Sequence, residues 1–205
     1  MSTPITQPNL FKNLRDLENR ISALERRKID GIFTDLPTIG NYDGRTIIFE
    51  IDSTTYWQLT YSSQTGDAYP WVCVGGVPLW DEVLTSEATA STTYAALATA
   101  GPDFTTPLAG IYEILVGAQC STAAVSGNTA FVSYDVGGTA ANDQWAAYAS
   151  AAAAVSVSVT PARKERHTIS SASQLIICKY RSSATASGTV TFVRRWLHGM
   201  PIRVG

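Results

Sequence analysis

Stretches in which apolar and polar residues strictly alternate recur from residue 110 onward, and they constrain the fold more than any other feature of the sequence. In GIYEILVGAQC every second residue from Tyr112 to Cys120 is apolar, and VSVSVT repeats the alternation over residues 155–159. A period of two residues places successive side chains on opposite faces of a β-strand. Gly, Ser and Pro separate these stretches, without the intervening helix that a parallel sheet needs. We therefore predict that residues 85–205 form a β-sandwich of jelly-roll type.

Residues 31–84 form a shorter and more acidic segment. They carry one basic and seven acidic side chains, and the stretches TIIFEID, YWQLTYS and WVCVGG each have the composition of a strand. Turn-forming residues precede them in LPTIGNYDGR. We predict a small antiparallel β meander with an acidic outer surface. Three strands are only marginally stable on their own, so the meander should pack against its neighbours.

Residues 1–30 have a different pattern, in which apolar residues are spaced alternately four and three apart. This is the spacing of a heptad repeat, whose apolar positions face a partner helix. A helix packed on its own β domain is the alternative, but such a helix usually has a wider apolar stripe. We predict an N-terminal arm with a short α-helical coiled coil that joins several chains. Its core residues are Leu10, Leu14, Leu17, Ile21 and Leu24.

The stretch RISALE indicates how many helices this coiled coil contains. With Ile21 and Leu24 in the core, Arg20 and Glu25 fall at flanking positions, where side chains of neighbouring helices pair. RISALE also resembles the Arg-h-x-x-h-Glu motif, with h apolar, of short three-stranded coiled coils. The resemblance implies a homotrimer in which Arg20 and Glu25 form an ion pair between chains. The fold class predicted for the whole chain is mainly β: this coiled coil, the meander and the sandwich.

Composition argues against several classes of function. The 205 residues have a net charge of −2, whereas a protein that binds nucleic acid phosphates needs an excess of Lys and Arg. No apolar run approaches the roughly 18 residues of a membrane-spanning helix. The start, MSTPITQPNL, lacks the basic and apolar regions of a secretory signal. We expect no nucleic acid partner and no insertion into a membrane.

The sequence offers few candidates for catalysis. Glu50 and Asp52 lie two apart on one predicted strand, and paired carboxylates can hydrolyse glycosides, but an acidic solvated face explains them better. The two histidines, His167 and His198, are too few for a histidine-based metal centre. His167 lies in the charge run RKERH, which we interpret as a solvated loop, with a subunit contact or a contact with an anionic surface as the alternatives. We predict a protein that is not an enzyme, with no cofactor and no metal.

Three features of the β-rich segment have open interpretations. Cys120 and Cys178 could meet across two sheets, although small buried apolar residues are the simpler interpretation of these cysteines. The stretch WAAYASAAAA, residues 145–154, is compatible with a helix, a loop or a strand. From residue 121 to residue 162 only Asp135 and Asp143 are charged, which is typical of close subunit packing or of fibre-like β proteins.

Three stretches carry a resemblance to known proteins: YDGRTIIFEID, YWQLTYSSQTGDAYPWVCVGGVPL and KYRSSATASGTVTFVRRWLHGMPIRV. Together they resemble a group of tailed-bacteriophage virion proteins, which are labelled minor tail protein, head fibre or capsid decoration protein. YPWVCVGGVPL is the most specific part. The resemblance implies a non-enzymatic, commonly trimeric protein that is assembled in the host cytoplasm and exposed on the virion surface, where its partners are capsid or tail proteins.

We therefore expect a homotrimeric capsid decoration protein or head fibre, because the chain is short and has no long shaft. The alternative is a tail receptor-binding protein whose sandwich recognises a glycan on the host surface. Aromatic side chains at the loop tips would favour that alternative. A depolymerase that cleaves sugars is a third interpretation, and it would require two carboxylates in one cleft.

Overall fold

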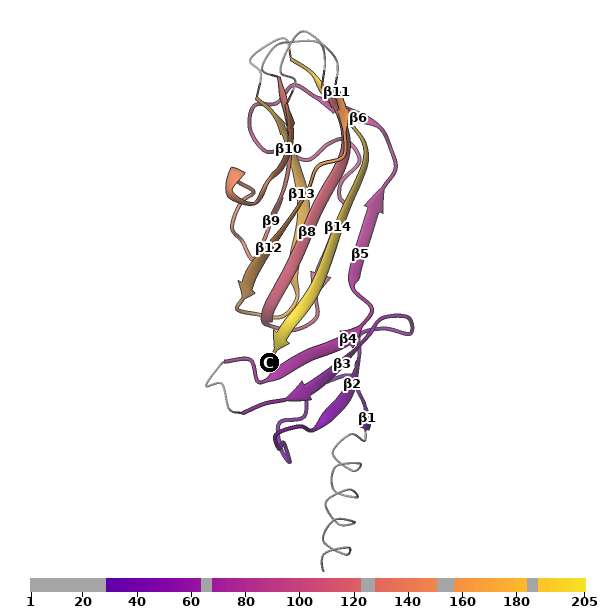
Figure 1. Ribbon diagram of the computed structural model, residues 1–205, viewed down its shortest axis with the longest axis vertical. Helices are drawn as coiled ribbons and strands as arrows, with labels where there is room; N and C mark the ends of the chain where they lie inside the picture. Colours follow the sequence, from indigo (N-terminus) through magenta and orange to yellow (C-terminus); the bar gives the residue numbers. More distant parts are fainter. Residues whose placement is uncertain (1–28, 64–67, 123–127, 151–156, 184–187) are drawn as a thin grey trace, which may run out of the picture. The chain divides into compact units, whose positions relative to one another are not determined.

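The regular secondary structure of the described residues is almost entirely β-strand (Figure 1). The one helical element in the described part of the chain is a single 3-10 turn, Asp143–Trp145. The computed structural model describes five segments, which are residues 29–63, 68–122, 128–150, 157–183 and 188–205.

This architecture corrects the predicted fold class, which added an N-terminal α-helical coiled coil to the β structure. The described residues contain no α-helix, because period-two alternation, and not a heptad spacing, governs their apolar residues. The prediction rested on seven residues that lie outside the described part of the chain. They are Leu10, Leu14, Leu17, Arg20, Ile21, Leu24 and Glu25.

The chain divides into two compact units, of which the first ends at Gly76. Its four strands lie side by side in chain order. The last three form an antiparallel meander, and β1 is added in parallel to β2. One face of the sheet is buried through the side chains of Ile47, Phe49, Trp57, Leu59 and Trp71. The strands are β1 (Ile29–Phe33), β2 (Thr46–Glu50), β3 (Tyr56–Tyr61) and β4 (Trp71–Gly76).

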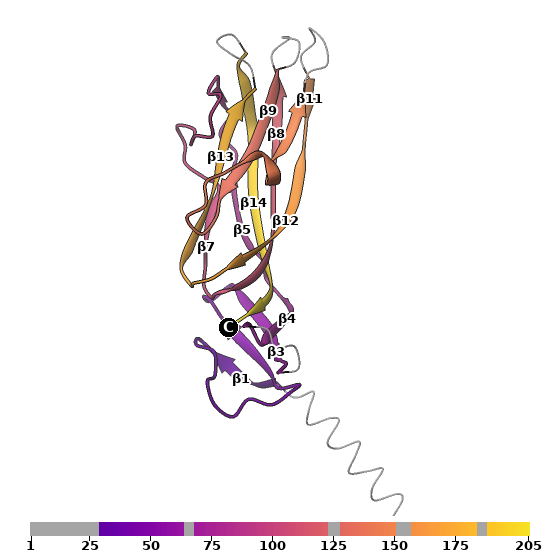
Figure 2. The ribbon, with the colours of Figure 1, turned by 90° about the vertical axis from the view of Figure 1, so that its left-hand side faces the viewer.

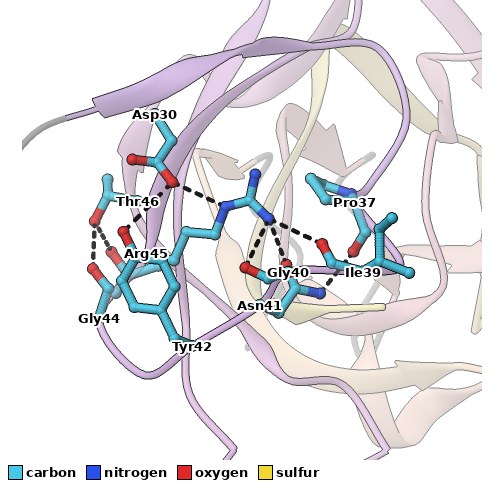
Figure 3. A network of polar contacts seen from close by, with 10 residues as sticks. Asp30, Pro37, Ile39, Gly40, Asn41, Tyr42, Gly44, Arg45 and Thr46 are labelled. Atoms are coloured by element: carbon cyan, nitrogen blue, oxygen red, sulfur yellow. Dashed lines mark hydrogen bonds and ion pairs between the residues drawn. The ribbon is translucent and has the colours of Figure 1, made fainter.

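Arg45 organises the long connection between the parallel strands β1 and β2 (Figure 3). Its Nε donates to the Asp30 carboxylate at 3.0 Å, and its Nη1 donates to Asn41 Oδ1 at 2.8 Å and to the Ile39 carbonyl at 3.2 Å. The guanidinium also lies 5.7 Å from the ring centroid of Phe33. Because one side chain satisfies partners on both β1 and the connection, the crossover keeps a defined path.

The second unit, Val77–Gly205, begins earlier than the predicted boundary between residues 84 and 85. The strands β5 (Leu79–Val83) and β6 (Glu87–Thr89) both pair antiparallel with β14 (Val190–Val204). Leu79 is buried in this unit. We predicted residues 77–84 to belong to the meander, but the pairing of β5 with β14 places them in the sandwich.

Two antiparallel sheets form the sandwich. Sheet I has the order β5/β6–β14–β8–β11/β12, and sheet II has the order β7–β13–β9–β10. Figure 2 shows the long strands β8 and β14 running side by side through the unit. The remaining strands are β7 (Asp103–Thr106), β8 (Gly110–Thr122), β9 (Thr129–Asp135), β10 (Ala147–Ser150), β11 (Val157–Val159), β12 (Ala162–Ile169) and β13 (Gln174–Ser182).

The strand order confirms the predicted jelly-roll-like sandwich. If β5/β6 count as the first strand and β11/β12 as the sixth, sheet I contains strands one, eight, three and six. Sheet II then contains strands two, seven, four and five. This order is that of two Greek keys wrapped into a jelly roll.

The core between the sheets follows the alternation seen in the sequence. In β8 the side chains of Tyr112, Ile114 and Val116 are completely buried, and the intervening residues face outward. A β-bulge between Phe192 and Arg194 shifts the phase of β14. As a result Arg195 points inward and is fully buried, where its Nη1 donates to Glu87 Oε2 at 3.1 Å.

Two local predictions about the second unit are resolved or corrected. RKERH is not a solvated loop: it lies in β12, where Arg163, Glu165 and His167 alternate with more exposed neighbours. Within the ambiguous stretch 145–154, Ala147–Ser150 is strand β10, in which Ala147 and Ala149 are buried. Alanine is accepted in this strand because its small side chain packs closely against the core.

Candidate functional site

The carboxylates considered for catalysis do not form an acid–base pair. Glu50 ends β2, and Asp52 lies in the turn that follows. Asp52 Oδ1 accepts hydrogen bonds from the backbone N–H groups of Thr54 at 2.7 Å and Thr55 at 2.8 Å. The hydrogen bonds from Thr54 lower the pKa of Asp52 to about 2. Asp52 is therefore a turn-forming residue that stays ionised, rather than a general acid.

The two histidines lie on opposite faces of sheet I. His167 faces inward from β12, and its Nε2 lies 2.7 Å from the hydroxyl of the buried Tyr134. Burial lowers the pKa of His167. His198 faces outward from β14 and packs edge-on to Trp80, with ring centroids 6.0 Å apart. The structure does not bring them together, and no group of three or more His, Cys, Asp or Glu in its described part could hold a metal ion.

The three cysteines are free thiols, so Cys120 and Cys178 do not form a disulfide. Cys120 and Cys178 are buried, as the simpler interpretation of the sequence expected. Burial raises the pKa of the Cys120 thiol to about 12 and raises that of Cys178 as well. Both therefore remain protonated and pack as small apolar side chains.

Among the described residues, no helix is long and apolar enough to cross a membrane.

The most developed polar site lies on the outer face of sheet II. Phe131 of β9 is flanked across the sheet by Tyr148 of β10 and Arg181 of β13. The Arg181 guanidinium lies 3.7 Å from the Phe131 ring centroid and 5.3 Å from that of Tyr94. Tyr148 is 61% exposed and lies next to the Phe131 ring. Phe131 and Tyr94 thus hold the cation of Arg181 by cation–π contacts.

Asp143 completes this arrangement from the 3-10 turn. Arg181 Nη2 donates to both carboxylate oxygens, at 2.8 and 2.7 Å, and Arg181 Nε donates to Oδ1 at 3.1 Å. The Tyr94 hydroxyl donates to the same Oδ1 at 2.8 Å. The hydrogen bonds from Arg181 lower the pKa of Asp143, so the carboxylate is ionised at neutral pH. Its side chain remains 61% exposed, whereas that of Arg181 is 15% exposed.

A groove of about 570 Å³ opens above this pair. Two loops, residues 92–94 and 140–144, line it together with the Arg181 side chain, and we call it the Arg181 groove. Its lining is rich in hydroxyl and amide side chains. A groove of this kind offers a ligand hydrogen bonds from these side chains beside apolar surface.

Both loops of the Arg181 groove are anchored to the sandwich by hydrogen bonds. The first is held by the reciprocal backbone pair between Ala95 and Tyr180, at 3.0 and 2.9 Å. The second is held where Ser133 Oγ donates to the Asn142 carbonyl at 2.9 Å and where the Ala141 N–H donates to Asp135 at 2.8 Å. Hydrogen bonds of the fold itself therefore hold both loops in place.

Sequence reasoning did not identify the Arg181 groove. Tyr94 and Arg181 are 87 residues apart and meet only through the pairing of β13. The available signal was Asp143, one of two charged residues in an otherwise uncharged stretch of β-strands. A charge retained in such a stretch indicates a specific partner.

A second surface lies on the outer face of sheet I. A cross-strand row joins Trp80, His198 and Leu115, and Trp196 lies in the next row of β14. We call these four residues the tryptophan face. Trp80 is 51% exposed and the other three are partly exposed. A shallow pocket of about 270 Å³ lies beside Trp80 and Trp196. Large exposed apolar side chains that gather on one face are typical of an interaction surface.

Comparison with known proteins yields little. No family model matches the chain, and no curated protein sequence matches it. Among solved structures, the chain is similar to the globular domain of zebrafish complement 1qA protein, at 11% sequence identity and a TM-score of 0.37. The similarity covers 58% of this chain and 96% of the zebrafish domain.

Proposed function

We propose that the protein is a non-enzymatic structural component of a bacteriophage virion, a homotrimeric capsid decoration protein or head fibre exposed on the particle. The sequence resemblance of its meander and C-terminal strands to tailed-phage virion proteins supports this proposal. The tryptophan face is the observation that carries it, because it provides an apolar surface on which copies of the chain can associate.

The tryptophan face suits association between copies for two reasons. It is largely apolar, with Trp80, Leu115 and Trp196 around His198, and charged pairs flank it, such as Lys164 with Glu113 at 2.8 Å. An apolar centre with a polar rim is the usual composition of a protein interface. Burying a Trp side chain also removes a large apolar area from water, at roughly 25 cal/mol for each Å².

The chemistry of the described polar groups agrees with a structural role. Asp52 forms a turn, His167 pairs with a buried tyrosine, and Glu87 neutralises the buried Arg195. Each of these groups is therefore engaged in a contact that holds the fold.

The alternative function is that of a tail receptor-binding protein that recognises a glycan on the host surface. The Arg181 groove is the observation that favours it, because an open groove that combines hydroxyl and amide side chains with apolar and aromatic surface matches the chemistry of saccharides. Both functions agree with a trimer, so the position of the protein on the particle distinguishes them.

Electron microscopy of the source phage, labelled with an antibody against the purified protein, tests this proposal. The proposal predicts label distributed over the capsid. Label confined to the tail tip would favour the receptor-binding alternative. Both functions would be overturned if intact particles carry no label and disrupted particles also react with the antibody no more than an unrelated control does.

A further inference from the structure

We propose that the Arg181 groove binds a neutral saccharide, with the Asp143 carboxylate as the acceptor of its hydroxyl groups. This inference deepens the glycan-recognising alternative and rests on it for the biological source of the saccharide. The binding itself is a property of the second unit and can be measured without the virion.

The position of Asp143 is the first argument. A carboxylate has about four acceptor sites, and in the described structure Oδ1 receives three donors while Oδ2 receives one, from Arg181 Nη2. Oδ2 therefore retains acceptor capacity on a side chain that is 61% exposed. Arg181 and Tyr94 fix the carboxylate in place. The protein therefore loses little conformational entropy when a ligand donates a hydrogen bond to Oδ2.

The surroundings of Asp143 are the second argument. The side chains of Thr92, Thr93, Asn142 and Gln144 line the same groove, and they can both donate and accept hydrogen bonds. A saccharide has hydroxyl groups with the same dual character. It also has apolar C–H faces that pack on aromatic rings, and Tyr94 supplies a partly exposed ring in the groove.

The charge of the site excludes acidic ligands. The positive charge of Arg181 is already paired with Asp143 and is largely covered, so it is not offered to an anion. Asp143 is the more exposed member of this ion pair, and its ionised carboxylate presents only acceptors to the carboxylate of a sialic or uronic acid, which also only accepts. We therefore infer a neutral saccharide.

The groove is built for binding rather than for cleavage. Hydrolysis of a glycoside requires two carboxyl groups on either side of the scissile bond. Asp143 is the one carboxylate among the described residues that line the groove. Its pKa is lowered by Arg181, so it cannot act as the acid that protonates a leaving group.

Saturation-transfer NMR on the full chain tests the inference. The probes are methyl glycosides of glucose, galactose and mannose, N-acetylglucosamine, and glucuronic acid as the acidic comparison. We expect at least one neutral probe to bind, with its ring protons saturated, and glucuronic acid to bind more weakly. No transfer to any neutral probe at millimolar concentration, or stronger binding of glucuronic acid, would overturn the proposal.

Substitutions locate the binding site. Asp143→Ala and Tyr94→Phe should each weaken binding of the best neutral probe, Asp143→Ala by about tenfold, because a hydrogen bond to a charged group is lost. Asp52→Asn is the matched control, since it neutralises an exposed carboxylate of the first unit while an amide can still form the turn. Circular dichroism confirms that each variant is folded.

If a folded Asp143→Ala variant binds the probe as tightly as the wild type, the groove is not the site. Failure of this inference differs from failure of the proposed function. If this inference fails, the protein does not bind the saccharide probes, although the antibody still labels the particle. If the proposed function fails, the antibody does not label the particle, although the purified protein still binds a probe.

Discussion

The ring of Trp196 packs directly against the backbone of Gly117, its cross-strand neighbour in sheet I. A Cβ atom added at Gly117 would lie 2.3 Å from the ring. The absence of a side chain at Gly117 therefore allows Trp196 to lie close to the sheet, and this contact sets the shape of the tryptophan face.

We expect Gly117→Ala to displace Trp196 outward and to weaken association between chains while the sandwich remains folded. Overpacking of this kind costs roughly 1–3 kcal/mol where the neighbour cannot move away. Trp196 is partly exposed, so it can move. Light scattering over a dilution series, with circular dichroism in parallel, measures the two effects separately.

Gly75→Ala is the matched control for Gly117→Ala. Gly75 is also a strand glycine, and an added Cβ meets nothing within 4 Å. It should leave the mass distribution unchanged. Equal behaviour of the two variants would contradict the role given to the contact between Gly117 and Trp196.

The buried pair of Arg195 and Glu87 is the second test. Glu87→Ala leaves the charge of a fully buried Arg195 without its partner, which should destabilise the second unit by about 3 kcal/mol in denaturant unfolding. Glu165→Ala removes the partner of the more exposed Arg163 and should cost less than ~1 kcal/mol. A similar decrease in the free energy of unfolding in both variants would show that the buried ion pair contributes no more to stability than the exposed one.

The alternation of residues predicted most of the sandwich, because β8, β9 and β13 each have one face in the core and one outside. It did not predict the position of Arg195. The period of two breaks at the bulge between Phe192 and Arg194, and two adjacent arginines in RRW give no sign of which one turns inward. Bulges depend on the partner strand, which a local pattern does not contain.

The candidate site was less predictable than the fold for a related reason. Asp143, Tyr94 and Arg181 come from a 3-10 turn, a loop and a strand that are remote in sequence. The strand pairing of sheet II, together with the backbone pair between Ala95 and Tyr180, brings them together. Glu50 and Asp52 are close in sequence and were predicted to share one face of a strand, but Asp52 lies beyond the end of β2 and forms a turn instead.

The first unit should respond to acid through Asp52. The pKa of this carboxyl is about 2 in the folded chain against 3.8 for the free side chain, because Thr54 donates to it. Its contribution to stability is therefore complete above pH 3.8 and is lost as the pH falls through about 2. Thermal unfolding of the wild type should show this loss.

Two variants check the assignment to Asp52. Asp52→Asn should have a flatter stability profile than the wild type across this range, because it cannot be protonated. Thr54→Val, which removes one donor, should move the loss to higher pH. Parallel profiles for the wild type and Asp52→Asn would contradict the assignment.

The unit boundary is tested by comparing two fragments. Residues 77–205 retain β5, in which Leu79 is buried and Asp81 accepts a hydrogen bond from the Asp103 N–H at 2.8 Å. Residues 85–205 lack this strand and leave part of β14 without its partner. We expect the longer fragment to unfold at a clearly higher temperature. Equal melting temperatures would place the boundary at residue 84 after all.

The mass of the wild-type protein in solution tests the account most directly, because the proposed structural role depends on association between copies. Light scattering at micromolar concentration should give three times the chain mass of 22.0 kDa, and Trp80→Glu should reduce that mass by placing a charge on the tryptophan face. A wild-type mass of one chain, 22.0 kDa, would contradict the account, and a mass of two chains would contradict the trimer.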